Sequence, residues 1–164
     1  MHLPAAFYRR GAVTVARDLL GVRLCTAAGS WRITETEAYV GEGDTACHAR
    51  RGRTPRTAVM YLPGGAAYVY LCYGIHALLN IVTGEKDEPE AVLVRGVQGI
   101  PGPGRVTRAA GIDLSFNEEN LLRSKRLWLE DDGTRFAYTA APRVGIDYAS
   151  ERDRQRLWRF IAHE

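Results

Sequence analysis

Apolar and polar residues alternate over much of the first hundred positions, and this pattern predicts strands more often than helices. Branched and aromatic side chains fit a pleated surface, and glycine-rich turns separate the segments. We expect strands over residues 22–26, 31–40, 66–73, 77–82, 91–97 and 127–130. Short turns join the first strand to the second and the third to the fourth, which predicts two hairpins.

Helices are expected at fewer places. Val15, Ala16 and Leu19 fall near helical spacing, and further short helices are expected over residues 105–110 and, after Asn117 as a cap, 118–124. Strands therefore dominate the first two thirds of the chain. This order predicts an α+β fold: one domain over residues 1–164, with a curved, mainly antiparallel β-sheet core and flanking helices.

The segment of residues 31–40 is the predicted central strand. Strict alternation places Ile33, Glu35, Glu37 and Tyr39 on one face. Unpaired buried carboxylates are costly, so this face is either the solvated side of an edge strand or a site that uses a carboxylate. The segment alone leaves both interpretations open.

A long connection, residues 41–63, follows this strand, and long connections in compact domains are usually functional or mobile. We expect Asp44 to cap a short helical turn that carries His48, and Thr54 with Pro55 to start another turn. His48 could be structural or catalytic, and its closeness in sequence to the carboxylate strand favours a catalytic role.

The second hairpin is rich in tyrosine. Tyr68 and Tyr70 could simply be core aromatics, but Tyr73 falls near the tip, where a side chain is harder to bury. An exposed aromatic residue at a hairpin tip fits stacking or wedging against a nucleic-acid base.

The charge pattern is compatible with an anionic partner, although charge alone favours plain solubility. The net charge is +3, and Lys86 and Lys125 are the only lysines, so arginine supplies nearly all of the positive charge. Arginine side chains match phosphates better than lysine side chains do. Four arginines crowd residues 50–56, whereas acidic residues gather at 85–90. This segregation suits a face that meets a polyanion, although it also suits plain solubility.

Composition argues against several other classes. The chain of 164 residues is 46% hydrophobic and 25% charged, as in ordinary globular domains. No apolar run is long enough to span a bilayer, and no signal peptide is evident, so we expect no membrane partner and a cytoplasmic location. Cys25, Cys47 and Cys72 include no Cys-x-x-Cys pair, which favours buried thiols over disulfides or a metal site.

Taken together, these residues resemble the alkyladenine (3-methyladenine) DNA glycosylase family. The matching positions are Glu35-Thr36-Glu37-Ala38-Tyr39, Asp44, His48, Thr54-Pro55-Arg56, residues 68–74, Asn80 and residues 92–95. Family members are single-domain, metal-free proteins built on an antiparallel sheet. They excise alkylated or deaminated purines, such as 3-methyladenine, 7-methylguanine and hypoxanthine, from double-stranded DNA. The resemblance therefore implies damaged duplex DNA as the partner and no cofactor, and we expect a monomer.

The resemblance also implies a base-binding pocket. Glu37 would be the general base. Tyr39, His48 and Tyr70 would enclose the flipped base by stacking and hydrogen bonding. Asn80 falls where the family screens the purine edge against normal guanine.

Other residues would contact the rest of the DNA. By the resemblance, Tyr73 would be the wedge that enters the minor groove and replaces the flipped nucleotide, and Arg95 would contact DNA beside the pocket. From the arginine-rich loop we expect Arg53 and Arg56 to contact the DNA backbone. The family usually carries a longer, partly helical segment where this chain has only residues 96–101, which affects part of the DNA-contacting surface.

The expected reaction is hydrolysis of the N-glycosidic bond of a flipped nucleotide. Cleavage builds positive charge on the sugar, and a nearby carboxylate can stabilise that charge and deprotonate a water. A lyase would need an amine nucleophile, and neither Lys86 nor Lys125 is well placed for that role. We therefore expect a monofunctional enzyme that leaves an abasic site.

Two alternatives remain. The glycine- and proline-rich residues 100–104 suggest a helix-hairpin-helix glycosylase, but the helix expected before that turn is missing. The arginines and hairpin tyrosines would also suit a non-catalytic nucleic-acid-binding module. A test of base release separates the enzyme from the binding module.

Overall fold

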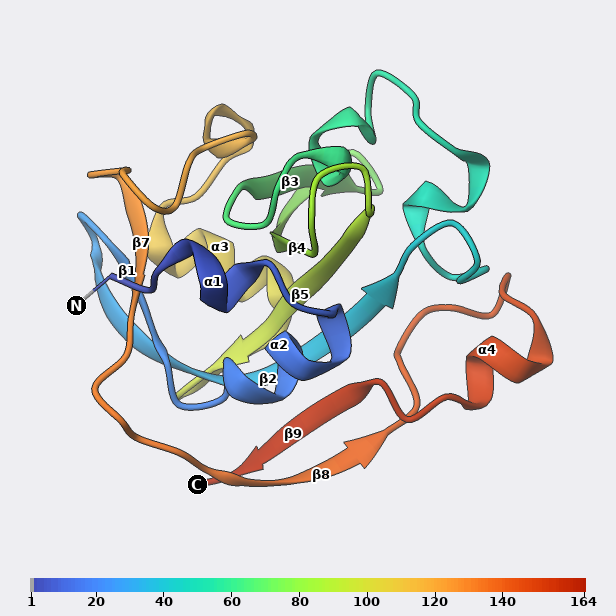
Figure 1. The fold of residues 1–164 in the computed structure, drawn as a ribbon. Coiled ribbons are helices and arrows are strands. Elements are labelled where there is room, and N and C mark those ends of the chain that lie inside the picture. Colours follow the sequence, from blue (N-terminus) through green and yellow to red (C-terminus); the bar gives the residue numbers. More distant parts are fainter. Residues whose placement is uncertain (1) are drawn as a thin grey trace.

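Nine strands dominate the computed structural model, which describes residues 2–164 (Figure 1). They are β1 (Arg23–Thr26), β2 (Gly29–Val40), β3 (Ala67–Cys72), β4 (His76–Thr83), β5 (Glu90–Val97), β6 (Ile100–Pro101), β7 (Leu127–Glu130), β8 (Ala137–Ala141) and β9 (Arg159–His163). The helices are short: α1 (Ala5–Tyr8), α2 (Ala12–Asp18), α3 (Pro103–Ala110) and α4 (Glu151–Gln155). Three 3₁₀ turns accompany them: η1 (His48–Arg51), η2 (Ala58–Tyr61) and η3 (Leu114–Phe116).

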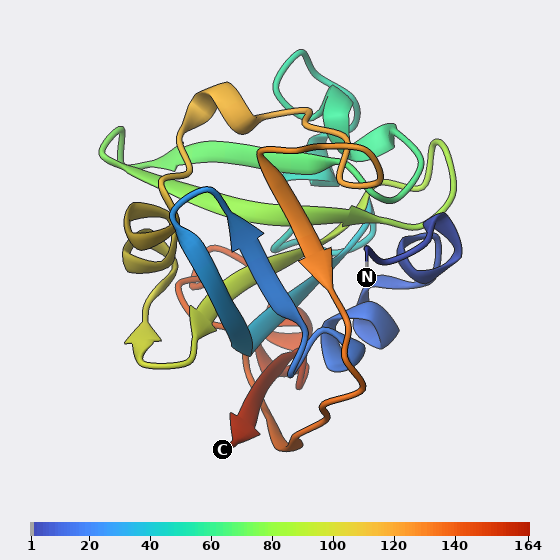
Figure 2. The ribbon, with the colours of Figure 1, turned by 90° about the vertical axis from the view of Figure 1, so that its left-hand side faces the viewer.

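All strands of residues 2–164 belong to one antiparallel sheet, in which β2 is central. The main order is β3-β4-β5-β2-β1-β7, while β6 pairs with β5, and β9 pairs with both β2 and β8. Figures 1 and 2 show a sheet that curls strongly, with α1 and α2 on one side of the molecule and α3 on the opposite side. The predicted single-domain α+β fold with a curved antiparallel sheet is confirmed.

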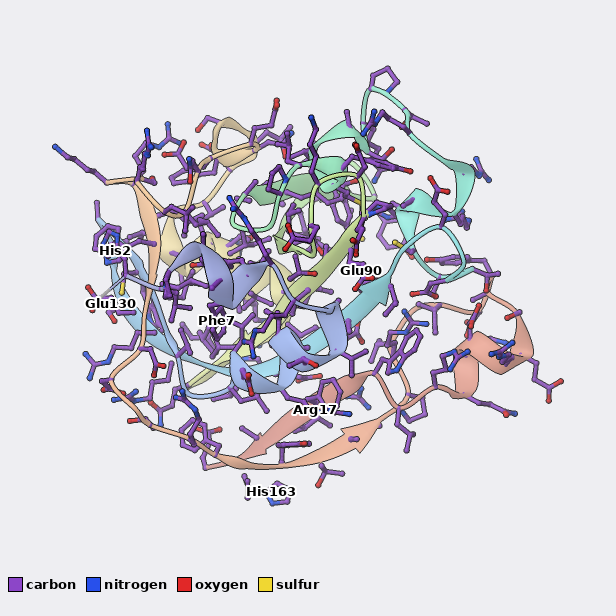
Figure 3. The ribbon with its side chains drawn as sticks, in the orientation of Figure 1. His2, Phe7, Arg17, Glu90, Glu130 and His163 are labelled. Atoms are coloured by element: carbon purple, nitrogen blue, oxygen red, sulfur yellow. The ribbon has the colours of Figure 1, made fainter. Side chains whose placement is uncertain are left out.

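The main core fills the inside of this curl. Side chains of α2, α3 and most strands form one buried cluster, and the buried Thr36 hydroxyl of β2 donates to the Ala16 carbonyl of α2 at 2.9 Å. Figure 3 shows Arg17 on the side of α2 that faces β9, where its guanidinium lies 5.2 Å from the centre of the Phe160 ring. Each fully buried aliphatic side chain contributes about 1.5–3 kcal/mol, so this cluster stabilises the sheet that carries the site.

The alternation predicted for β2 is wrong at Ile33. The pairing of β2 with β5 shifts register on both sides of Glu35, and such a bulge re-aims the side chains that precede it. Ile33 therefore lies in the main core with Ala38 and does not share the face of the glutamates. Beyond the bulge, Tyr39 packs against two smaller buried clusters that surround the connection after β2.

The β3–β4 hairpin has the turn that the sequence predicts. Cys72 pairs with His76, and the Ile75 amide donates to the Cys72 carbonyl at 3.1 Å across the tip. Tyr73 and Gly74 both have positive φ, at 53° and 67°. This conformation is uncommon for an aromatic residue and directs the Tyr73 side chain away from the sheet. Figure 2 shows the hairpin projecting from the body of the molecule on the same side as α3.

Two local predictions are wrong. Asp44 does not cap η1, the turn that carries His48, because Cys47 precedes that turn without a side-chain cap; the Asp44 carboxylate accepts instead from the amides of Val40 and Ala46 and so caps the turn before η1. Residues 118–124 form turns, not a helix. Their backbone is occupied elsewhere: the Glu118 amide donates to the Ala67 carbonyl at 2.8 Å, and the Leu121 amide to the Gly65 carbonyl at 2.8 Å.

Candidate active site

A cavity of about 840 Å³ lies where the β3–β4 hairpin, the connection after β2 and the loop after β8 meet. This volume is in the range of small-molecule pockets. Aromatic side chains from all three regions line it, together with arginines, most of which are exposed. They are Tyr39, His48, Tyr68, Tyr70, Tyr73, Tyr148, Arg56, Arg95, Arg105 and Arg108. The cavity therefore joins a ring-lined interior to a basic rim.

Glu37 lies directly behind the cavity wall. Its side chain is fully buried and is not itself among the lining groups, but Tyr39, Leu93, Arg95 and Val144 around it are. The Tyr39 hydroxyl donates to Glu37 Oε1 at 2.8 Å, and the Val144 amide donates to Glu37 Oε2 at 2.7 Å. Each carboxylate oxygen can accept more than one hydrogen bond, so both retain capacity for a further donor.

The surroundings of Glu37 act on its charge in opposite directions. Burial raises the pKa of the carboxyl, whereas the Arg95 guanidinium, the Val144 amide and the Tyr39 hydroxyl favour the ionised form and limit the rise. Burial together with the nearby Glu37 charge also raises the pKa of Tyr39, which keeps its hydroxyl as a donor. A desolvated acid beside a cavity is typical of a functional site.

Arg95 belongs to the wall of the cavity and faces two acids. Its Nη1 lies 3.8 Å from Glu37 Oε2, and its Nε lies 3.4 Å from Glu35 Oε2. Glu35 in turn accepts from Arg159 Nη1 at 3.1 Å. The Arg95 Nε is buried and has no hydrogen-bond partner within residues 2–164. This guanidinium is therefore held by charge more than by close hydrogen bonds.

Three rings form one wall of the cavity. The centres of the His48 and Tyr70 rings are 4.6 Å apart, and those of Tyr68 and Tyr70 are 5.3 Å apart. The His48 Nδ1 and the Tyr68 hydroxyl share a hydrogen bond of 2.9 Å. Burial, with the nearby Arg56 and Arg50 charges, lowers the pKa of His48 to about 4. The imidazole is therefore neutral at physiological pH.

Asn80 contributes an amide to the same cavity. It lies on β4, is 4% exposed, and donates from Nδ2 to the Tyr68 carbonyl at 3.2 Å. Its position is fixed by β-sheet pairing, since Asn80 lies opposite Tyr68 on β3 and Leu93 on β5. The sheet therefore holds one polar amide rigidly in the lining of the cavity.

Tyr73 extends the cavity outward at the hairpin tip. Its side chain is 93% exposed, and Ile75 beside it is 73% exposed. Large exposed apolar groups are unusual at a projecting tip and mark a contact surface. The sequence prediction that Tyr73 lies at the tip is confirmed, while its role as a wedge stays a prediction.

The two arginines predicted to contact the DNA backbone differ in position. Arg56 lines the cavity, and its guanidinium lies 5.1 Å from the centre of the Tyr70 ring. Arg53 is not a lining residue. It pairs with Asp87 and lies over the Tyr61 ring at 4.4 Å. The structure therefore brings Arg56 to the candidate site and leaves Arg53 outside its wall.

Among the residues of the site that the sequence did not reveal, three come from one loop. Val144 supplies a donor to Glu37, Tyr148 lines the cavity, and Arg143 pairs with Asp44 in the interior beside them. They belong to the irregular loop after β8, which joins the site from about a hundred residues further along the chain. The one signal in the sequence was the arginine between a proline and a valine, in a segment whose polar and apolar residues do not alternate as they do in a half-exposed strand.

Within residues 2–164, no group of three or more His, Cys, Asp or Glu side chains is arranged to hold a metal ion. None of the described helices is long and apolar enough to cross a membrane.

Comparison with known proteins identifies the family. Residues 6–101 and 98–164 match the family model described as "Methylpurine-DNA glycosylase (MPG)". The two matched segments overlap at residues 98–101, just after β5. The match therefore covers nearly the whole protein.

Relatives of similar length match as well. A protein of Psychrobacter cryohalolentis is 38% identical, with 95% of this chain and 89% of the relative covered. The values for a Borrelia garinii subsp. bavariensis protein are 42%, 94% and 92%, and for a Nitrosococcus oceani protein 42%, 96% and 88%. Each bears the name "Putative 3-methyladenine DNA glycosylase". The chain therefore belongs to the methylpurine-DNA glycosylase family of DNA repair enzymes, which hydrolyse N-glycosyl bonds in DNA.

Proposed function

We propose that this protein swings alkylated or deaminated purines out of duplex DNA and hydrolyses their N-glycosidic bond with a water activated by Glu37. The substrates would include 3-methyladenine, 7-methylguanine and hypoxanthine. The single observation that carries the proposal is a buried carboxylate directly behind a ring-lined cavity, with both of its hydrogen-bond donors fixed by the fold.

The free lone pairs of Glu37 support the water-activating role. With one donor on each oxygen, the carboxylate can accept a hydrogen bond from a water that enters between Tyr39 and Arg95. The same negative charge would stabilise positive charge as it develops on the sugar. General-base and electrostatic roles of this kind contribute roughly 10²–10⁴-fold each to a rate.

The cavity wall suits the proposed bases. Stacking of one base on aromatic rings contributes about 1–3 kcal/mol and is tolerant of base identity. A neutral His48 does not repel a purine that carries the positive charge of alkylation, and Glu37 attracts it. Alkylated purines are also good leaving groups, so they need no strong general acid. Hypoxanthine would need hydrogen bonds as it leaves, and we assign these to His48 and nearby backbone groups.

Flipping requires a group that fills the gap in the stack. Unstacking a base costs a few kcal/mol and costs least at damaged pairs. An exposed Tyr73 on a projecting hairpin could offset this cost by entering the minor groove.

We further propose that the enzyme has no lyase activity. Schiff-base chemistry needs an amine within reach of the sugar. Lys86 and Lys125 are the only lysines, both are exposed, and neither lines the cavity. The expected product is free base with an abasic site in an uncut strand.

The test is a single-turnover survey with duplexes that contain 3-methyladenine, 7-methylguanine, hypoxanthine or only normal bases. We expect free base from the damaged duplexes and strand breaks only after heat or alkali. Binding of damaged duplexes without any base release would overturn the proposal and favour a non-catalytic DNA-binding module. Nicking without heat or alkali would overturn the monofunctional assignment.

A further inference from the structure

A buried ion pair joins the loop after β2 to the loop after β8. The side chains of Arg143 and Asp44 are 0% and 1% exposed. Arg143 Nη1 donates to Asp44 Oδ2 at 2.6 Å, and Nη2 donates to Asp44 Oδ1 at 3.0 Å. This two-bond geometry is the form in which an arginine holds a carboxylate in a fixed orientation.

The same guanidinium binds two further segments of the chain. It donates to the carbonyls of Ala38 at 3.0 Å and Asp153 at 3.3 Å. Its carbon lies 5.0 Å from the centre of the Tyr39 ring and 4.9 Å from that of Trp158. Arg143 therefore fixes β2, the loop after it, α4 and the segment before β9 relative to one another.

Stability alone is a poor reason for such a pair. The desolvation of two buried charges offsets much of their attraction, and well-packed apolar residues are often as stabilising. What the pair supplies is a defined geometry. The question is which group in the molecule needs that geometry.

Both donors of Glu37 are linked to Arg143. Val144, whose amide donates to Glu37 Oε2, is the next residue in the chain. Tyr39, whose hydroxyl donates to Oε1, places its ring against the guanidinium. Ala38, whose carbonyl accepts from Arg143, lies between Glu37 and Tyr39 on β2. Neither Arg143 nor Asp44 lines the cavity.

We propose that Arg143 and Asp44 are positioning residues that hold the Val144 amide and the Tyr39 hydroxyl on Glu37, so that this carboxylate is oriented for water activation. They act through Glu37 and do not touch the substrate. The inference rests on the proposed function, because it gives the pair a task only if Glu37 activates water.

The charges around Glu37 give the proposal a pH signature. The groups that face Glu37 are Arg95 from β5, Tyr39 on β2, and Arg143 with the Val144 amide from the loop after β8. All of them lower the pKa of Glu37 against the effect of burial. If Arg143 can no longer make its hydrogen bonds to Asp44 and Ala38, we expect the Val144 amide to move away from Glu37 and the pKa of Glu37 to rise further.

The decisive variant is Arg143→Lys, which keeps the charge but cannot make the two-bond contact. Base release from a hypoxanthine duplex is measured in single turnover at saturating enzyme across the acid range. We expect the maximal rate to fall by roughly 10- to 100-fold, as for a misplacement of about 1 Å. We also expect the acid limb to move to higher pH, and the Val144 amide proton to lose its hydrogen-bonded NMR shift.

Arg156→Lys is the matched control. Arg156 pairs with Asp153 at 3.1 Å and lies over the same Trp158 ring at 4.7 Å, but no hydrogen bond or ring contact within residues 2–164 joins it to Tyr39 or Val144. This variant should keep the wild-type rate, acid limb and Val144 shift. Asp44→Asn serves as a second test, because it has the same shape and should reproduce the effects of Arg143→Lys.

Two results would overturn the proposal. One is a folded Arg143→Lys protein with the wild-type acid limb and an unchanged Val144 shift. The other is a loss of rate in Arg143→Lys and Asp44→Asn that is fully accounted for by a loss of folded protein, as measured by thermal unfolding. A wild-type protein that releases no base would instead refute the proposed function, so the two failures are distinguishable.

Discussion

At the scale of single residues, the main feature is the Glu37 carboxylate, because the charges and hydrogen-bond donors around it do not fully offset the cost of burying its charge. The pKa of Glu37 is raised by burial in spite of Arg95, Tyr39 and Val144. The folded state therefore binds a proton at Glu37 more tightly than the unfolded chain does. Its contribution to stability is largest at low pH and is lost as the pH rises through the raised pKa.

The upward shift of the Glu37 pKa predicts that removing the charge of this side chain stabilises the protein at neutral pH. Glu37→Gln removes the buried charge and keeps the shape, so the melting temperature at neutral pH should equal or exceed that of the wild type. The difference should shrink as the solution is acidified. Thermal unfolding of both proteins across the acid range measures it. A variant that is clearly less stable than wild type at neutral pH would mean that the ion pair with Arg95 outweighs the desolvation of Glu37.

The pH dependence of the reaction follows from the same group. A general base works when ionised, so base release should fall as the pH drops through the raised pKa of Glu37. Burial lowers the pKa of His48 to about 4, so the imidazole should not set this limb. The pH–rate profile of His48→Gln should therefore keep the wild-type midpoint even if its rate is lower. A shift of the midpoint in His48→Gln would show that the imidazole, and not Glu37, sets the acid limb.

Residue patterns revealed only part of the site. Glu37, Tyr39, His48, Tyr70 and Asn80 all belong to segments with recognisable strands or turns, and the structure places them around or directly behind one cavity. Val144 acts through its backbone amide, which has no signature in the identity of a side chain. Such a donor is visible only when the loop after β8 is placed against β2.

At the scale of elements, the β3–β4 hairpin carries the strongest local prediction. Two β-prone runs around a glycine gave its position, and the positive φ of Tyr73 explains why the ring projects. The same local reasoning predicted a helix over residues 118–124, and this prediction was wrong. Asn117 looks like a helix cap, but its side chain accepts from the Val69 amide at 2.9 Å, so a tertiary contact overrides the local preference.

The hairpin predicts a specific loss of flipping. Tyr73→Ala removes the projecting ring and should slow single-turnover release of hypoxanthine at saturating enzyme, by about 10-fold if the ring contributes about 1–2 kcal/mol as aromatic stacking does. Tyr73→Phe keeps the ring and should keep most of the rate. Equal rates for wild type and Tyr73→Ala would show that the ring is not a wedge.

The bulge in β2 also belongs to this scale. Strict alternation put Ile33 with the glutamates, but the register shifts around Glu35 turn Ile33 into the main core. A bulge depends on pairing with β5, and the pattern of a single strand does not reveal it. The bulge lets one strand bury Ile33 in the main core and hold Glu37 directly behind the cavity wall.

At the scale of the whole molecule, charge is distributed to suit a polyanion. Arg56, Arg105 and Arg108 are exposed and line the cavity that carries the candidate site, and Tyr73 lies at the same opening. The short connection after β5 leads directly into α3, which contributes Arg105 and Arg108.

This distribution predicts a strong salt dependence. The logarithm of the DNA association constant should fall linearly with the logarithm of salt concentration, by about 0.9 per phosphate contact. Arg56→Gln should reduce that slope by about one contact. Arg10→Gln is the control, since Arg10 pairs with Asp18 at 2.7 Å beside α2 and lies outside the cavity. Fluorescence anisotropy in a salt series gives the slopes, and equal slopes for wild type and Arg56→Gln would exclude Arg56 from the backbone contact.

The most direct test of the account is base release by Glu37→Gln in single turnover, with saturating enzyme and a hypoxanthine duplex. Glu90→Gln is the matched control, because Glu90, labelled in Figure 3, is also a strand glutamate with a burial-raised pKa and a backbone donor, Ala12, but is not among the residues that line the cavity. We expect Glu37→Gln to lose base release by a factor of about 10² or more while damaged DNA still binds, and Glu90→Gln to keep the wild-type rate. Wild-type base release by Glu37→Gln would contradict the account.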